Sequence, residues 1–167
     1  MTSMNNIILN HQQIVHKTKR IAYQIYEANV DEEAIILAGI DKNGYVFAEE
    51  LKNVLESISD LNVTLCKVSI NKKDPLKDVK TSIDEAEYRN MSLVLVDDVL
   101  NSGTTLMYGV KHFLNVPLKR FKTAVLVNRN HKKYPIKADF KGISLSTSLN
   151  EHVQVNFEEK DYKAILK

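Results

Sequence analysis

Two adjacent carboxylates followed by a loop of small hydroxyl residues form the part of the sequence best suited to chemistry. The apolar run Leu93–Val96 ends in Asp97 and Asp98, and a Ser-Gly-Thr-Thr loop at 102–105 follows. Ionised carboxylates accept hydrogen bonds from the two hydroxyls of a sugar diol, and side by side they need such partners or solvent. The free N–H groups of a helix that begins at the loop bind phosphate. We therefore expect a ligand that carries both a diol and a phosphate; a solvated strand end with an N-capped helix is the structural alternative.

Strands that alternate with helices must position these groups. Short continuous apolar runs predict strands buried on both faces, and apolar residues at helical spacing predict helices between them. This alternation implies right-handed crossovers and a central parallel sheet flanked by helices, an α/β fold. The predicted strands are Ala34–Ile40, Val63–Ile70, Ser92–Val96, Phe121–Val127 and, last, Val153–Phe157; one predicted helix is His11–Ala28, a second carries Val46, Leu51, Val54, Leu55 and Ile58, and a third carries Leu106, Met107, Val110, Phe113 and Leu114.

The polar connection at about 71–90 is long for a compact domain and is typical of a mobile lid. A short helix is expected within it near Ile83–Tyr88. A surface excursion without a role is the alternative that composition allows equally.

Length and composition bound the class of protein. The 167 residues fit one domain, and 44% hydrophobic with 26% charged residues are those of a soluble globular protein. A net charge of +2 gives no basic field that demands nucleic acid. Cys66 is the only cysteine, which excludes an intrachain disulfide. No signal-like or membrane-length apolar run is present, so we expect a cytoplasmic protein without membrane contact.

Gly39 and Gly44 have the spacing of a nucleotide P-loop, but Tyr45 and Val46 stand where Lys and Ser/Thr are required. This mismatch excludes a P-loop nucleotide triphosphatase.

The segment from Leu93 to Thr105 resembles the signature of the type I phosphoribosyltransferases, which bind phosphoribosyl pyrophosphate (PRPP). The resemblance implies that Asp97 and Asp98 hold the ribose 2′ and 3′ hydroxyls. It also implies a Mg²⁺ ion carried by PRPP or pyrophosphate, with no direct metal ligand from the protein. The implied PRPP- and phosphate-binding residues are Asp97, Asp98, Val99, Asn101, Ser102, Gly103, Thr104 and Thr105.

The similarity extends over nearly the whole chain, to the pyrimidine operon attenuation regulators that are also uracil phosphoribosyltransferases. Ala34–Ile40 with the turn Asp41, Lys42, Asn43 and Gly44 matches the first strand and the pyrophosphate loop of that subgroup. Val127–His131 resembles its Val-Asp-Arg-Gly-His run, which implies a small hood at about 128–152 and a base pocket that contains Arg129 and His131. The match continues through Pro135–Phe140, Gly142, Thr147, Ser148, Glu151 and Val153.

Two loops depart from the subgroup. Lys42-Asn43-Gly44 replaces the usual Thr-Arg-Gly, so the guanidinium that grips phosphate with two parallel hydrogen bonds is absent. Ile70–Asp74 replaces a Tyr-Arg-Asp-Asp run, and Lys72 or Lys73 can supply the missing charge, so we add both to Asp97 and Asp98 as catalytic candidates.

The RNA-binding surface of such regulators is also depleted. Ile143 and Leu149 stand where Lys is common, and Tyr23 where His is common, while Thr18 and Arg20 remain. Because phosphate contacts dominate RNA affinity, RNA is a disfavoured partner.

The leading hypothesis is thus a single-domain, Mg²⁺-dependent phosphoribosyltransferase that joins PRPP to a nucleobase, with uracil as the implied base, and that forms a homo-oligomer. The alternative is a sensor of nucleotide or PRPP that regulates pyrimidine genes, either through RNA by way of its Lys17–Arg20 face or with reduced catalysis.

Overall fold

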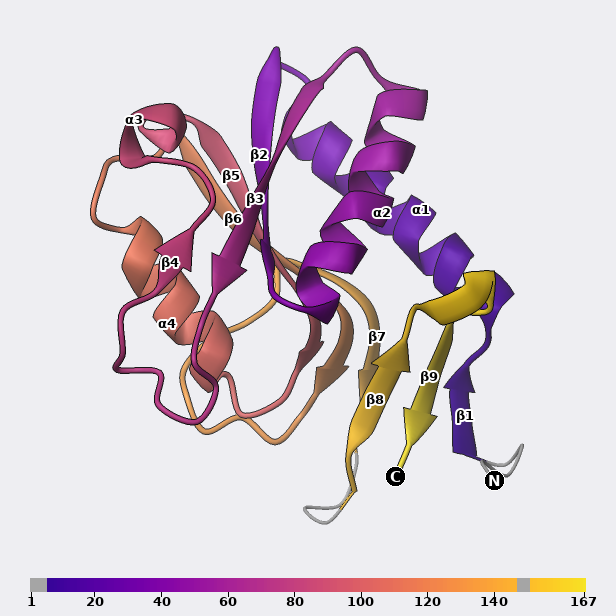
Figure 1. Cartoon of the computed structure of the whole chain (residues 1–167). Coiled ribbons are helices and arrows are strands. Elements are labelled where there is room, and N and C mark those ends of the chain that lie inside the picture. The colour runs from indigo at the N-terminus through magenta and orange to yellow at the C-terminus, as the bar shows by residue number, and fades with distance from the viewer. Residues whose placement is uncertain (1–5, 147–150) are drawn as a thin grey trace.

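A six-stranded sheet forms the centre of the fold, as the computed structural model shows for residues 6–146 and 151–167 (Figure 1). The strand order is β4-β3-β2-β5-β6-β7, and every neighbouring pair is parallel except β3 and β4. This arrangement confirms the α/β fold with a mainly parallel sheet. The strands are β2 (Ala34–Ile40), β3 (Asn62–Ser69), β4 (Lys80–Thr81), β5 (Ser92–Leu100), β6 (Arg120–Arg129) and β7 (Phe140–Leu145).

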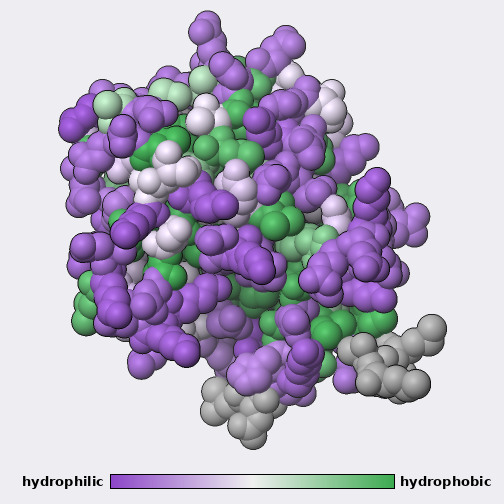
Figure 2. All heavy atoms as spheres, in the orientation of Figure 1, coloured by the Kyte–Doolittle hydropathy of each residue, from purple (hydrophilic) through white to green (hydrophobic). Residues whose placement is uncertain are grey.

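Helices cover both faces of this sheet. α1 (His11–Ala28) and α2 (Asn43–Ile58) pack on one face, and α3 (Glu85–Tyr88) and α4 (Thr104–Phe113) pack on the other (Figure 1). Successive side chains of a strand point to opposite faces, so Ile35 joins the hydrophobic cluster beneath α1 and α2, whereas Ile36 joins the cluster beneath α3 and α4. Burial on both faces explains why the strands read as unbroken apolar runs. Because the apolar residues lie between the layers, hydrophilic residues cover most of the surface on the face that Figure 2 shows.

A second, three-stranded antiparallel sheet joins the two ends of the chain beside the main sheet (Figure 1). Its order is β1 (Ile7–Leu9), β9 (Lys163–Leu166) and β8 (Val153–Asn156), and we call it the hood sheet. The sequence led us to expect a hood at about 128–152. In the structure residues 128–145 instead complete β6 and form β7, which pairs in parallel with β6 from Ala124 opposite Phe140 to Arg129 opposite Leu145. Thr147, Ser148 and Leu149 lie outside the described residues.

The hood sheet is fastened to α1 and α2 through Tyr162. The Tyr162 hydroxyl donates to Glu50 Oε1 at 2.7 Å, and the Tyr162 N–H donates to His11 Nδ1 at 3.0 Å. The Tyr162 ring packs edge-on against Phe157, and Phe157 stacks with Phe47 of α2. Burial and the hydrogen bond to Glu50 raise the pKa of Tyr162 to about 12. The Tyr162 hydroxyl therefore stays protonated at neutral pH and donates a hydrogen bond to Glu50.

Most element boundaries agree with the sequence. His11–Ala28 and Ala34–Ile40 are confirmed residue for residue, and a short helix does occur within 83–88. α1 begins at His11 because Asn10 and Gln13 form a capping box, in which each side chain accepts the other's backbone N–H. No helix of the described ranges, 6–146 and 151–167, has the length and apolar character needed to cross a membrane.

Three expectations are corrected. Val153–Asn156 is not the last strand, because β9 follows it. Leu114 does not belong to the buried face of α4, since the helix ends at Phe113 and Leu114 is 65% exposed. The motif strand does not stop at Val96: β5 continues to Leu100, because β6 still pairs with it there.

Candidate functional site

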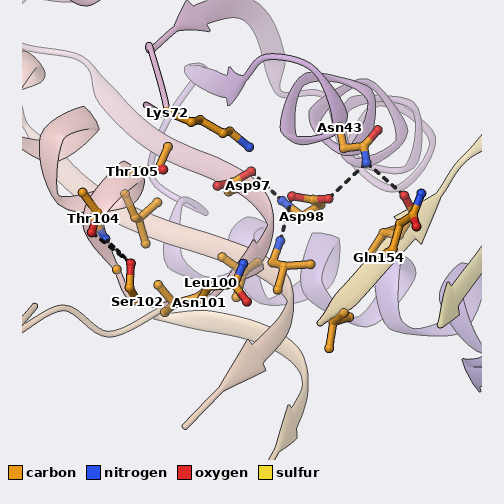
Figure 3. Close-up of a pocket in the computed structure, with 16 residues that line it drawn as sticks. Asn43, Lys72, Asp97, Asp98, Leu100, Asn101, Ser102, Thr104, Thr105 and Gln154 are labelled. Atoms are coloured by element: carbon orange, nitrogen blue, oxygen red, sulfur yellow. Dashed lines mark hydrogen bonds between the residues drawn. The ribbon is translucent and has the colours of Figure 1, made fainter. Parts of the chain in front are cut away.

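A cavity of about 300 Å³ lies at the carboxyl ends of the central strands (Figure 3). It brings the carboxylates of β5 together with the loop that precedes α4, with the start of α2 and with strand β8 of the hood sheet. Ligands of open α/β folds bind outside the carboxyl ends of the strands, so this is where a substrate is expected. The lining residues are Asn43, Lys72, Asp97, Asp98, Val99, Leu100, Asn101, Ser102, Gly103, Thr104, Thr105, Leu106, Val125, Val153, Gln154 and Val155.

Asp97 and Asp98 lie inside β5, and both line the cavity. β2 stops pairing with β5 at Val96, whereas β6 continues, so one edge of β5 is open next to the two carboxylates. Lys72 extends toward Asp97 from one side, and Asn43 approaches Asp98 from the other (Figure 3). Two backbone N–H groups hold the carboxylates in place. The Asp98 N–H donates to Asp97 Oδ1 at 2.9 Å, and the Val99 N–H donates to Asp98 Oδ1 at 2.9 Å.

Asp97 is the more buried of the two carboxyls, with 5% of its surface exposed. Burial, followed by the neighbouring negative charge of Asp98, raises the pKa of Asp97 well above its ordinary value, and the charge of Lys72 opposes this rise. A carboxyl in this state gains from any hydrogen-bond donor or cation that enters the cavity. Ribose hydroxyls are donors of that kind.

The turn Asp41–Gly44 reaches the cavity through its second half. α2 begins at Asn43, whose side chain lines the cavity, whereas Asp41 and Lys42 are exposed and do not line it. The peptide bond between Asp41 and Lys42 is cis. Gly44 allows the close approach of α2 to β5, since a Cβ at this position would lie 2.8 Å from the Val96 carbonyl oxygen.

The loop before α4 has the form of an anion-binding site. Gly103 has a φ of +89°, a left-handed conformation that glycine adopts without strain, and α4 begins at the next residue, Thr104. Thr104, Thr105 and Leu106 of the first turn line the cavity, and no acidic residue occupies this turn, so the positive end of the α4 dipole lies at the cavity. Ser102 Oγ and Thr104 Oγ1 lie 2.9 Å apart and add two hydroxyl groups.

Backbone contacts from the segment after β6 hold this loop in place. Lys133 and Tyr134 donate their N–H groups to the Ser102 carbonyl at 2.7 and 3.0 Å. Arg129, a buried residue, donates from Nη1 to Asn101 Oδ1 at 3.1 Å. Arg129 therefore supports the loop, and neither it nor the exposed His131 lines the cavity as expected of base-pocket residues.

The structure separates the two lysine candidates. Lys72 lines the cavity and Lys73 does not; Lys73 is exposed, and its N–H donates to Asn71 Oδ1 at 3.0 Å. The remaining wall comes from Val153, Gln154 and Val155 of β8. We did not single out Gln154 or Val155 from the sequence, because their position depends on the pairing of the two chain ends.

The charged groups of the cavity fit a divalent cation that arrives with its ligand. Within the described part of the chain, no three His, Cys, Asp or Glu residues group closely enough to hold a metal ion by themselves. The cavity nevertheless carries two carboxylates and one lysine, and carboxylate oxygens are the ligands that Mg²⁺ prefers. Asp97 and Asp98 are thus the residues that would face a Mg²⁺ ion bound to a phosphate ligand.

A parallel α/β sheet whose strand ends bring a carboxylate pair next to the start of a helix is the arrangement expected of phosphoribosyl-binding proteins. The structure is similar to a hypoxanthine-guanine phosphoribosyltransferase of Bacillus anthracis, with a TM-score of 0.76, 19% identity and coverage of 98% of this chain and 99% of that one. It is also similar to the hypoxanthine phosphoribosyltransferase of Trypanosoma cruzi, with a TM-score of 0.77, 16% identity and coverage of 96% and 95%. These likenesses support the fold.

Sequence comparison defines the family. The model of the phosphoribosyl transferase domain family matches residues 4–160. The bifunctional protein PyrR of Haemophilus ducreyi is 31% identical over 169 residues, covering 95% of this chain and 93% of that protein. The bifunctional protein PyrR of Bacillus pumilus is 34% identical over 167 residues, covering 93% and 92%. The chain therefore belongs to the phosphoribosyltransferase family, an enzyme family of transferases, as its resemblance implied.

Proposed function

We propose that this protein transfers ribose 5-phosphate from PRPP to uracil and releases pyrophosphate. One observation carries the proposal: a single cavity combines two adjacent carboxylates, the start of a helix without acidic residues and one lysine. The resemblance of the whole chain to regulators that are also uracil phosphoribosyltransferases supports the choice of base.

Different residues of the cavity bind different parts of the substrate. The loop Ser102–Thr105 binds the 5′-phosphate, while Asp97 and Asp98 accept hydrogen bonds from the ribose hydroxyls. Lys72 faces the pyrophosphate and stabilises its charge as the bond from ribose C1 to oxygen breaks and the bond from C1 to the base nitrogen forms. Mg²⁺ bound to pyrophosphate supplies further charge neutralisation. Holding both reactants in one cavity is itself a large part of the rate enhancement.

The test is a base panel. Purified protein, Mg²⁺ and PRPP are incubated separately with uracil, cytosine, hypoxanthine, guanine and adenine, and nucleotide is measured by chromatography. We expect UMP from uracil, and its loss in the isosteric variant Asp98→Asn. Absence of product with every base would refute the transfer reaction. If PRPP or UMP then still raised the thermal midpoint, the alternative of a catalytically reduced sensor would replace it, since a ligand at a hundred times its Kd stabilises by about 2.7 kcal/mol.

A separate observation favours a second candidate function, binding of RNA. Lys132, Lys137 and Lys141 are all exposed, and partial burial, followed by the charges of Lys141 and Lys137, lowers the pKa of Lys132. None of the three takes part in a salt bridge within the described part of the chain. Arg20 extends this basic surface from α1, since its Nη2 donates to the carbonyls of Lys141 at 3.1 Å and Gly142 at 2.6 Å.

Filter binding with a pyrimidine-operon leader RNA across salt concentrations tests this candidate. The Lys137→Ala variant should bind the RNA more weakly and with a smaller salt dependence, because it loses a phosphate contact. Thr18 is expected to contribute nothing, because it is buried and its hydroxyl donates to the Ile14 carbonyl at 2.7 Å. An unrelated RNA of equal length that bound as tightly would remove the regulatory reading.

A further inference from the structure

Asn43 makes two hydrogen bonds that connect separate parts of the cavity wall. Its side-chain nitrogen donates to Asp98 Oδ2 at 3.2 Å and to the Val155 carbonyl at 2.9 Å (Figure 3). Asp98 belongs to β5 of the main sheet, and Val155 belongs to β8 of the hood sheet. A side-chain amide has two N–H groups, so one nitrogen can hold both acceptors at once. Asn43 thus bridges the carboxylate that faces the ribose and the strand that covers the cavity.

The position of Asn43 is fixed from behind. It is the first residue of α2, and the residue after it, Gly44, packs against the backbone of Val96 and Asp97. The Asn43 backbone therefore cannot follow β8 if the hood sheet moves, whereas its side chain can release either acceptor. In the pattern of the resembling family an arginine stands here; its longer, charged fork suits phosphate, whereas the short amide reaches both Asp98 and Val155.

The carboxylate that accepts from Asn43 is also the one available to a ligand in the cavity. At 3.2 Å the bond from Asn43 to Asp98 lies at the long end of the range for N–H···O hydrogen bonds, and among residues 6–146 and 151–167 only the Oδ1 atom of Asp98 has a backbone donor, the Val99 N–H. A ribose hydroxyl that donates to Asp98 restricts the carboxylate to one orientation. An oriented carboxylate in turn orients the Asn43 amide toward Val155.

We propose that Asn43 is a positioning residue that couples occupancy of the ribose site to the hood strand β8. When a ribose occupies Asp98, the Asn43 amide holds β8 over the cavity, so binding of the phosphoribosyl group favours the closed wall that a base then contacts. This inference rests on the proposed function only in placing a ribose at Asp98. Coupling between the two sites is reciprocal, so closure of β8 also favours ribose binding.

Hydrogen–deuterium exchange with ribose 5-phosphate as the probe tests the coupling without any reaction. Saturating ribose 5-phosphate should slow exchange at the loop 101–105 and also in peptides that span Val153–Asn156, by about fivefold or more. In Asn43→Leu, which keeps the size of the side chain but removes both donors, the loop should still be protected while the β8 response falls below about twofold. Asn43→Ala serves as a second variant, and unfolding curves confirm that each variant folds.

Tyr162→Phe is the matched control. It removes the bond from Tyr162 to Glu50, which is another attachment of the hood sheet, without touching Asp98. Exchange in β8 should be faster at rest, but ribose 5-phosphate should still slow it. Protection of β8 that is equal in wild type and Asn43→Leu, or absent in wild type although the loop is protected, would overturn the inference. Failure of ribose 5-phosphate to protect the loop would instead count against the proposed function and against ribose at Asp98.

Discussion

Replacing Gly44 with alanine tests whether close packing of α2 on β5 builds the site. The added Cβ would lie 2.8 Å from the Val96 carbonyl oxygen and 3.0 Å from both Cα and Oδ1 of Asp97. Two of these atoms are backbone atoms of a central strand, which cannot rotate away. The variant must therefore shift the start of α2, and with it Asn43, or displace Asp97.

The cost follows from this overlap. Extra methyl groups in close-packed interiors destabilise by about 1–3 kcal/mol, and the better helix propensity of alanine offsets at most about 1 kcal/mol. The gain is smaller here because Gly44 is the second residue of α2. We expect a net loss of about 1–2 kcal/mol, which for a chain of this size lowers the thermal midpoint by about 2–8 °C. Misplacement of Asp97 should lower kcat/KM with PRPP by about a hundredfold.

Gly109→Ala provides the matched comparison. Gly109 is also a buried helical glycine, but the nearest atoms to its Cβ are Leu95 Cδ2 at 2.9 Å and Ile70 Cδ1 at 3.6 Å, the ends of flexible side chains. Calorimetry should show an unchanged or slightly raised midpoint for Gly109→Ala and a clear fall for Gly44→Ala. Equal midpoints, or a Gly44→Ala protein with wild-type activity, would refute the view that this contact shapes the site.

Three further predictions concern side chains of the site and the hood. Because the pKa of Asp97 is raised in the folded state, the stability of the wild type should fall as the pH rises from the ordinary carboxyl pKa through the raised one. The Asp97→Asn variant should lack this pH dependence and should have a higher thermal midpoint at neutral pH. It should also fail to bind ribose 5-phosphate. Lys72→Ala should lower kcat/KM by about a hundredfold, whereas Lys73→Ala should leave it nearly unchanged, and equal effects in a steady-state assay would contradict the assignment. Tyr162→Phe should lower the free energy of unfolding in urea by about 1 kcal/mol through loss of the hydrogen bond to Glu50; an unchanged midpoint would show that this bond adds no stability.

The sequence predicts the central strands well because their signal is local. Ala34–Ile40 is buried on both faces, so its composition alone reports its environment. β5 is the instructive exception. Two carboxylates look like the end of a strand, yet β6 continues to pair with Asp97 and Val99 after β2 has ended. A strand that is open on one edge only cannot be recognised from its own residues.

The hood sheet is the part that local reasoning misses. β1 and β9 have three and four residues, and they pair across nearly the whole chain, Ile7 with Ile165. Neither strand has a pattern long enough to read. Gln154 and Val155 belong to β8, which pairs with β9 in the same sheet, so their place in the cavity wall depends on tertiary pairing that local sequence does not show. The loop at 101–105 could be predicted because its polar groups are contiguous in the sequence and do not depend on distant pairing.

The two departures from the family pattern fall on opposite sides of the carboxylate pair. Lys72 extends toward Asp97 from one side, while Asn43 donates to Asp98 from the other (Figure 3). On the first side a charged residue replaces a charged residue, and the electrostatic task is retained with poorer geometry. On the second side the neutral amide of Asn43 stands where the family pattern has a cation, and this amide bonds to the Val155 carbonyl. Asn43 thus connects Asp98 directly to the hood strand. If the proposed roles hold, changing Lys72 should alter mainly kcat, whereas changing Asn43 should alter mainly the response of β8 to ribose 5-phosphate.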